Sequence, residues 1–488
     1  MPIRFPSRVS PLLAALACAA QLCASPAAAQ EELPRGGWLP AAVRDALARH
    51  GLPESSLSVV VQEVGAAEPL LAWLPDTPRN PASVMKLVTT LAALDMLGPG
   101  HRWQTALLAT EPVIDGKLDG DLYLRGGGDP YIVTETFWKF LHDLRLTGLE
   151  HVTGDLVVDE SLFQPTPEDP AAFDGRPYRS YNVAPRAMLV NFLTTRFIFR
   201  PDEARGRVVI SADPPLANLE VINDLRLTDG RCGRYLRRLR MDVERRADGA
   251  AVRFQGVYPA ACGTFHIDRA VSDALPYVYG VFAALWRGMG GRLDGGVRAG
   301  VTPAHATVLH EMSSPTLAEL VRAINKHSNN VMTRTLLLAL GVARYGPPGT
   351  EAKGRDAVRA WLAEQGIDTS EVVLENGAGL SRDERISASA VAAILLDAYA
   401  MPLMPEFVSS LPLTGVDGTM RRRHRDGDIA NRGHLKTGLI DDVSAVAGYL
   451  MSASDRRWVV VSLQNHRGVH RGIGKRVQDA LIEWVYAQ

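Results

Sequence analysis

One long β-rich stretch is the feature that most constrains how this chain can fold. Between residues 102 and 301, short runs such as QTALLAT, GDLYLR and GDLVVDES alternate with Gly, Asp and Pro. This pattern is typical of short strands joined by turns. With 488 residues, the chain is also too long for one hydrophobic core. We therefore expect more than one domain.

The segments on either side of this stretch have a different character. Before it, the runs SLSVVVQEVG (56–65) and EPLLAWLPDT (68–77) predict strands. An apolar helical pattern at 80–97 then ends at a Gly-Pro-Gly run. Beyond the stretch, amphipathic patterns predict helices at 314–341, 354–366 and 387–400. Two hydrophobic runs predict strands at 443–453 and 457–466, and a last amphipathic pattern predicts a helix at 474–487.

The two flanking segments predict one domain made from distant parts of the chain. A strand pair followed by a C-terminal helix is what a sheet needs to be completed and covered on one face. We therefore expect an α/β fold in which residues 30–101 and 302–488 form one domain. Residues 102–301 would be inserted into it as mostly β structure.

The N-terminus has the pattern of an export signal. Arg4 and Arg8 precede an apolar run at 11–20, and Ala27-x-Ala29 is a cleavage site. The apolar run is too short to span a bilayer, and the rest of the chain has no uninterrupted apolar run near 18 residues. We predict that residues 1–29 are a signal peptide and that the mature protein is periplasmic, with no transmembrane segment. Lipidation at Cys18 or Cys23 is a weaker alternative.

Charge and cysteine content exclude several classes of protein. The formal net charge is −1, so no global basic footprint for nucleic acid exists. Cys232 and Cys262 remain after the signal peptide, and one pair in an exported chain favours a disulfide over two free thiols. Without a CxxC or HExxH motif, the ligand set for a metal is poor. We expect neither a metal nor a cofactor.

The helix predicted at 80–97 contains an unusual pair in its first turns. Asn80 and Pro81 suit a helix start, but Lys86 opposes the helix dipole there. Ser83 and Lys86 are three residues apart and would share one helix face. A serine needs a base to become a nucleophile, and a lysine close to a second cation has its pKa lowered enough to accept a proton. The pair predicts a nucleophile with its own base.

Two further motifs follow in order: Ser328-Asn329-Asn330 and Lys436-Thr437-Gly438. Each motif is weak alone, but S-x-x-K, S-x-N and K-T-G in this order form the penicilloyl-serine transferase set. Lys436 would supply the second cation close to Lys86. We therefore expect these distant segments to meet in one active site.

The chemistry of the residues suggests a role for each. Ser328 would relay a proton to the departing amine, and Asn330 would orient the substrate or the lysine base. Lys436 and Thr437 suit a substrate carboxylate, and Gly438 lets a substrate backbone lie against the strand. The backbone N–H groups of Ser83 and Leu439 would form the oxyanion hole.

With these motifs and the long gap between Ser83 and Ser328, the chain resembles the class C low-molecular-weight penicillin-binding proteins. This family, of the penicillin-binding protein 4 type, contains D-alanyl-D-alanine carboxypeptidases and endopeptidases. Other runs are similar to the family too: GGGDP (126–130), YNVAPRAMLVN (181–191), NGAGLSR (376–382) and LPLTGVDGTMRRR (411–423). Leu439 differs from the Ser, Thr or Ala of many relatives.

The resemblance implies a β-lactamase/transpeptidase-like domain, with an antiparallel sheet flanked by helices. It also implies that the insertion forms two nested domains, the inner one at roughly 185–270, and that the protein can form a homodimer. Asp129 would pair with the amine of a peptidoglycan stem, and Arg382 would meet its carboxylate. Apart from the resemblance, GGGDP is also an ordinary turn and Arg382 a candidate structural residue.

The predicted function is that of a serine D,D-peptidase acting on peptidoglycan peptides. Ser83 would attack the penultimate D-alanine, with Lys86 as base, and water would hydrolyse the acyl-enzyme. The enzyme would remove terminal D-alanine, cleave D-Ala–meso-diaminopimelate cross-links, or both, and β-lactams would acylate Ser83. One alternative is a β-lactamase of the same superfamily, against which the large insertion argues. The other is a catalytically silent wall-binding protein.

Overall fold

The computed structural model describes residues 37–164, 167, 169–233 and 239–488. The predicted signal peptide, with Cys18 and Cys23, lies outside these residues. Within them, every helix is too short or too polar to cross a bilayer.

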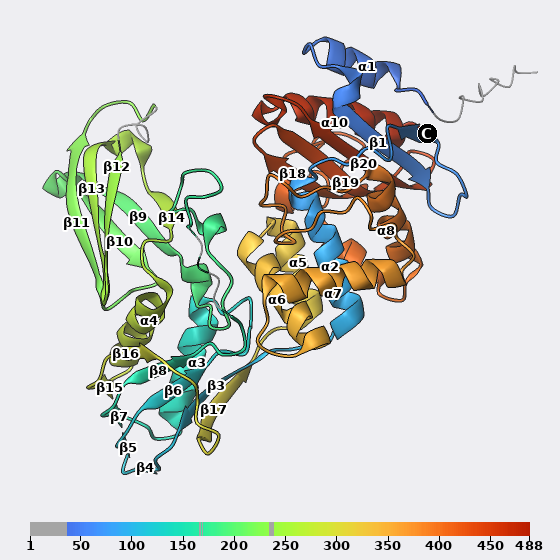
Figure 1. Cartoon of the computed structure of the whole chain (residues 1–488). Helices are drawn as coiled ribbons and strands as arrows, with labels where there is room; N and C mark the ends of the chain where they lie inside the picture. Colours follow the sequence, from blue (N-terminus) through green and yellow to red (C-terminus); the bar gives the residue numbers. More distant parts are fainter. Residues whose placement is uncertain (1–36, 165–166, 168, 234–238) are drawn as a thin grey trace, which may run out of the picture. The chain divides into compact units, whose positions relative to one another are not determined.

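The first domain is built on one five-stranded antiparallel sheet, ordered β18-β19-β20-β1-β2 (Figure 1). N-terminal and C-terminal segments share this sheet because β1 pairs with β20 along its whole length. The expected antiparallel sheet with flanking helices is therefore confirmed. Its strands are β1 (Leu57–Glu63), β2 (Leu71–Trp73), β18 (Gly433–Ile440), β19 (Val443–Met451) and β20 (Arg457–Asn465).

Side-chain alternation along β1 explains why helices cover both faces of the sheet. Val59 and Val61 join one core, which contains residues of α1 (Ala41–Ala48) and α10 (Ile473–Tyr486). Val60, between them, joins a second core with the remaining helices of this domain. Those helices are α2 (Lys86–Leu97), α5 (Leu317–His327), α6 (Asn330–Tyr345), α7 (Glu351–Glu364), α8 (Ala388–Ala400) and α9 (Met404–Ser410).

The helix expected at 314–341 is two helices. α5 ends at His327, Ser328 adopts φ +57°, and the Asn329 side chain caps α6 by accepting from Met332 N at 3.1 Å. The start differs as well, because Thr316 caps α5 in a reciprocal pair with Glu319. Because of this break, Ser328 has a non-helical backbone conformation between the two helices.

The insertion leaves and re-enters the first domain through paired strands. β3 (Gln104–Ala109) and β17 (Thr307–Ser313) are antiparallel neighbours in a five-stranded sheet, β16-β8-β6-β3-β17. A second, four-stranded sheet, β15-β7-β5-β4, shares a hydrophobic core with it. The other strands are β4 (Val113–Ile114), β5 (Lys117–Leu118), β6 (Leu122–Arg125), β7 (His151–Val152), β8 (Leu156–Asp159), β15 (Arg292–Leu293) and β16 (Val297–Ala299).

Two helices pack into the core of this part of the insertion, α3 (Thr134–Leu146) and α4 (Ala274–Gly288). The apolar run before Gly288 indicates α4, but we did not expect α3. Its buried residues nevertheless follow a helical period: Phe137, Phe140, Leu141 and Leu144.

Two three-stranded sheets, β10-β9-β14 and β11-β13-β12, enclose an aromatic core within the insertion. Phe199 contacts Phe254 edge to face, with ring centroids 5.0 Å apart. Cys232 and Cys262 form a disulfide beside this core, with Cα atoms 4.8 Å apart. The strands are β9 (Thr195–Asp202), β10 (Arg207–Asp213), β11 (Leu219–Thr228), β12 (Arg240–Arg246), β13 (Gly249–Pro259) and β14 (Phe265–Arg269). The limits of the predicted domains stay predictions.

Candidate active site

Ser83 lies in a short 3₁₀ turn, Ala82–Met85, immediately before α2. Ala82 has φ +44°, and the side chain of Asn80 accepts from Ala82 N at 2.9 Å. The Asn465 side chain, on β20, holds the backbone of Asn80: its Oδ1 accepts from Asn80 N at 2.8 Å and its Nδ2 donates to Asn80 O at 2.9 Å. Asn80 thus anchors a strained turn rather than capping the helix, because α2 itself begins only at Lys86.

Lys86 is fully buried and directs its ammonium nitrogen at the serine. Nζ lies 3.1 Å from Ser83 Oγ and 2.6 Å from Asn330 Oδ1, and it also donates to the carbonyl of Ala378. Burial is the main cause that lowers the Lys86 pKa well below its usual range, and the charge of Lys436 adds to it. Ser83 and Asn330, two of the predicted site residues, therefore contact Lys86.

Lys436 on β18 meets Ser328 at the break between α5 and α6. Its Nζ donates to Ser328 Oγ at 3.0 Å and to the Thr437 carbonyl at 2.9 Å. Burial lowers the pKa of Lys436 to about 7. The left-handed backbone of Ser328 is an uncommon conformation for a non-glycine residue, and such strain concentrates at functional sites.

Strand β18 runs so close to the serine turn that only glycine fits at position 438. An ideal Cβ there would lie 2.4 Å from Pro81 O and 3.1 Å from Ser83 N. Thr437, one residue earlier, donates its hydroxyl to Thr419 Oγ1 at 2.8 Å. The close packing brings the backbone of Ser83 against the edge strand of the sheet.

β18 is the edge strand of the sheet, and its outer edge carries backbone donors. Leu435 N donates outward, to Pro412 O at 2.8 Å, rather than to β19. Alternation along a strand then directs the N–H groups of Thr437 and Leu439 to the same edge. The Leu439 side chain is 53% exposed, so a leucine fits here without loss of a buried contact.

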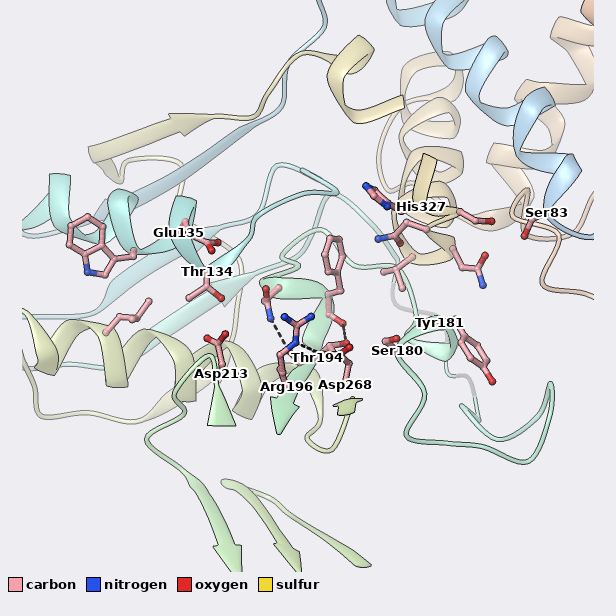
Figure 2. Close-up of a pocket in the computed structure, with 18 of the residues that line it drawn as sticks. Ser83, Thr134, Glu135, Ser180, Tyr181, Thr194, Arg196, Asp213, Asp268 and His327 are labelled. Atoms are coloured by element: carbon pink, nitrogen blue, oxygen red, sulfur yellow. Dashed lines mark hydrogen bonds and ion pairs between the residues drawn. The ribbon is translucent and has the colours of Figure 1, made fainter. Parts of the chain in front are cut away.

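A cavity of about 880 Å³ contains Ser83 and extends along the insertion (Figure 2). Ser328, Asn330 and Leu439 line it near the serine. The insertion contributes polar groups, including Arg196, whose Nε donates to Asp268 Oδ1 at 2.8 Å. Its other lining residues from the insertion include Thr134, Glu135, Trp138, Ser180, Tyr181, Asn191, Phe192, Thr194 and Asp213.

Neither Asp129 nor Arg382 lines this cavity. Asp129 is buried and accepts from Tyr131 N at 2.8 Å, which is a turn contact, and burial raises its pKa to about 6. Arg382 donates to the Asp441 carbonyl at 3.0 Å, and its guanidinium carbon lies 4.7 Å from the centre of the Phe173 ring. Both side chains thus have partners within the chain, and the substrate roles that the resemblance implies stay predictions.

Glu384 is a residue of the site that the sequence did not single out. Its side chain is completely buried, and Oε1 accepts from three successive backbone N–H groups, at 3.0–3.2 Å. In the sequence it stands in the charged run Arg382–Arg385, where a solvated turn is the ordinary expectation. Only burial distinguishes it from its neighbours. No group of three His, Cys, Asp or Glu side chains suitable for a metal occurs in the part of the chain that the structure describes.

The fold and the site define a class of protein. A helix-covered antiparallel sheet with a serine–lysine pair at the start of a central helix is the penicillin-binding, transpeptidase-like fold. The chain belongs to the D-Ala-D-Ala carboxypeptidase 3 (S13) family, whose sequence profile matches residues 39–488. It is a serine-type carboxypeptidase.

Individual relatives agree with this placement over most of their length. The D-alanyl-D-alanine carboxypeptidase of Actinomadura sp. (strain R39) is 28% identical over 425 residues, covering 83% of this chain and 77% of the relative. The D-alanyl-D-alanine carboxypeptidase DacB of Haemophilus influenzae is 24% identical, covering 85% and 86%. The crystal structure of penicillin-binding protein 4 (dacB) from Haemophilus influenzae has the same fold, with a TM-score of 0.77 at 22% identity, covering 91% of this chain and 99% of that one.

Proposed function

We propose that the chain is a periplasmic D,D-peptidase in which Ser83 is the nucleophile and Lys86 its base. The observation that carries the proposal is the set of partners around Lys86 Nζ. Two of them, Asn330 Oδ1 and the Ala378 carbonyl, are oxygens that can only accept hydrogen bonds. The third, Ser83 Oγ at 3.1 Å, can also donate.

This asymmetry directs the lone pair of the neutral amine at the serine. A neutral lysine has two N–H donors and one lone pair. When both N–H groups are given to the two carbonyl-type acceptors, the lone pair is left facing the Ser83 hydroxyl. The lowered Lys86 pKa makes the neutral form available. Lys86 is therefore oriented to remove the serine proton.

The acylation step follows from these positions. Ser83 Oγ attacks the carbonyl of the penultimate D-alanine while its proton passes to Lys86 Nζ. The oxyanion that forms would be stabilised by the backbone N–H groups of Ser83 and Leu439; the close approach of Gly438 to Ser83 N supports this pairing. The C–N bond then breaks, and a proton delivered through Ser328 allows the amine to depart. Water afterwards hydrolyses the ester.

Lys436 and Thr437 would bind the terminal carboxylate of the substrate. Lys436 contacts Ser328 and belongs to β18, the edge strand of the sheet, to which a substrate strand can add. The Thr437 hydroxyl, which contacts Thr419 at 2.8 Å, can turn to a carboxylate when one is present. A carboxylate also stabilises the cationic form of Lys436, which burial disfavours.

The substrates would be peptidoglycan stem peptides, with β-lactams as acylating inhibitors. One solved structure of the Haemophilus influenzae protein is described as a complex with a β-lactam. A similarly folded protein from Bdellovibrio bacteriovorus is described as a peptidoglycan endopeptidase, at 15% identity and a TM-score of 0.51. We propose that this chain cleaves cross-links as well as removing D-alanine. Homodimer formation, which the resemblance implies, is tested by sedimentation equilibrium.

Digestion of purified muropeptides tests the proposed function. The mature protein is incubated with disaccharide pentapeptide and with a D-Ala–meso-diaminopimelate cross-linked dimer, and products are identified by mass spectrometry. We expect loss of D-alanine from the first and monomers from the second, both abolished in Ser83→Ala. Ser409→Ala, which changes an exposed serine on α9, serves as the control. Unchanged pentapeptide, or products that persist in Ser83→Ala, would contradict the proposal.

A further inference from the structure

Glu384 has no role in the proposed acylation, yet its buried carboxylate accepts three backbone hydrogen bonds. A buried carboxylate is costly unless it is well hydrogen-bonded. Oε1 accepts from the backbone N–H groups of Glu375, Asn376 and Gly377, whereas Oε2 has no hydrogen-bond partner among the described residues. The bonded oxygen therefore holds a loop, and the other oxygen is left without a hydrogen bond among the described residues.

That loop is fastened against the serine turn and the start of α2. Thr89, one turn after Lys86, donates its hydroxyl to Gly377 O at 2.8 Å. An ideal Cβ at Gly379 would lie 1.9 Å from Ala82 O, so the two backbones are in direct contact. Between these two fixed points, the carbonyl of Ala378 accepts from Lys86 Nζ.

The position of the Ala378 carbonyl matters for the chemistry of the base. It is one of the two acceptor-only partners that direct the lone pair of neutral Lys86 at Ser83. If this carbonyl moved away, an N–H group of Lys86 could turn to Ser83 and the lone pair would be lost to the reaction. The loop must therefore be held in place for the base to stay oriented.

We propose that Glu384 is the positioning residue of Lys86: through the backbone N–H groups of residues 375–377 it holds the Ala378 carbonyl on Nζ, and its charge is the buried counter-charge of the base. This proposal rests on the role of Lys86 as base in the proposed function. Glu384 itself touches neither substrate nor Ser83 in this account and acts only through the lysine.

The charged groups around Lys86 support the electrostatic half of the proposal. Lys436 on β18 lowers the Lys86 pKa, whereas Glu384 opposes the lowering. Burial raises the pKa of Glu384 to about 7, and the three backbone N–H groups and Lys86 act in the opposite direction. Two groups that interact in this way titrate as a pair. The negative charge of Glu384 keeps Lys86 from losing its proton at too low a pH.

A pH profile separates this role from a purely structural one. The second-order rate constant for acylation by a fluorescent penicillin is measured from pH 5 to 9 in wild type, Glu384→Gln and Asp383→Asn. Glutamine keeps an oxygen for the backbone donors and removes the charge. Asp383 is the adjacent carboxylate and is exposed, so Asp383→Asn is the matched control.

We expect the acid limb of Glu384→Gln to move to lower pH by about one unit, with a maximal rate within about threefold of wild type. The direction follows because Lys86 loses a stabilising anion and gives up its proton more readily. Asp383→Asn should leave the limb unmoved. An acid limb that does not move in Glu384→Gln, or that moves to higher pH, would overturn the counter-charge role.

A second variant tests the loop and keeps the proposal open to refutation if Glu384→Gln does not fold. Thr89→Val removes the hydroxyl that holds Gly377 O while leaving every charge in place. We expect the maximal acylation rate to fall about tenfold with the acid limb unmoved, because the carbonyl is less firmly positioned. An unchanged rate would refute the positioning role. If Lys86→Met is acylated as fast as wild type, the proposed function on which this inference rests is refuted instead.

Discussion

Gly438→Ala tests whether the contact between β18 and the serine turn is as close as the structure has it. The new methyl group would lie 2.4 Å from Pro81 O and 3.1 Å from Ser83 N. Nonbonded carbon contacts relax only near 3.5 Å, so strand and turn must separate by about 1 Å. Overpacking of this kind costs about 1–3 kcal/mol of stability, which leaves a typical domain folded.

The same shift acts directly on the proposed oxyanion hole. The N–H groups of Ser83 and Leu439 belong to the two segments that must separate, so one donor is lost or misplaced. Loss of one such donor lowers the rate by about 10²–10³-fold. We therefore expect the acylation rate constant of Gly438→Ala to fall by about 10²-fold or more. Stability should fall by only about 1–3 kcal/mol.

The assay is acylation by a fluorescent penicillin, followed by gel electrophoresis at several times and concentrations. Urea unfolding of the same preparations measures stability. Gly427→Ala is the control, because a Cβ at that exposed position meets nothing within 4 Å. If Gly438→Ala is acylated as fast as Gly427→Ala, the β18–turn contact does not build the oxyanion hole.

Three further predictions concern the cationic side chains. Lys86→Met should lower kcat/KM for D-alanine release by about 10²–10⁴-fold, the usual contribution of a general base; a loss below tenfold would rule out Lys86 as the base. Because burial lowers the pKa of Lys436 to about 7, the folded protein binds fewer protons than the unfolded chain between pH 7 and 10. Lys436 should therefore contribute up to about 1.4 kcal/mol per pH unit to an increase in the free energy of unfolding with pH in that window. Lys86, whose pKa is also lowered by burial, adds to the increase, so urea titrations of Lys436→Met should show a smaller slope than those of wild type; an equal slope would contradict the prediction. Arg382→Ala should leave penicillin acylation within about threefold, since Asp441 and Phe173 occupy the guanidinium; a tenfold loss would indicate contact with the substrate.

The three motifs could be recognised in the sequence because each combines particular residue types at a fixed spacing; their catalytic roles stay proposals. Ser83 and Lys86 are close in sequence, so a helical turn alone brings them together. That Ser328 and Lys436 meet them depended on the order of three motifs. The structure pairs Lys86 with Ser83 at 3.1 Å and Lys436 with Ser328 at 3.0 Å, and the charge of Lys436 acts on Lys86.

The terminal strands of the sheet were predictable for a similar reason. The hydrophobic runs at both ends of the chain are long and bounded by turn residues, so their existence and type follow from local pattern. The pairing of β1 with β20 is a long-range contact that no local pattern contains. It agrees with the expectation that the two ends of the chain form one domain.

Other features depend on contacts that no local pattern contains. The break at Ser328 was missed because apolar residues continue on both sides of it, and a single left-handed residue has no periodic signal. The helix α3 was missed because its neighbours are short strands, although its apolar spacing is helical. Glu384 was missed because a glutamate beside Arg382, Asp383 and Arg385 is ordinarily solvated, and only the fold buries it.

The central claim is that Ser83 carries the acyl group, with Lys86 as its base. Peptide mass spectrometry after incubation with penicillin tests it most directly. We predict one adduct, on the peptide that contains Ser83, formed by wild type and by Ser409→Ala but not by Ser83→Ala, and formed far more slowly by Lys86→Met. An adduct on another residue, an adduct that persists in Ser83→Ala, or no adduct at all would contradict the account.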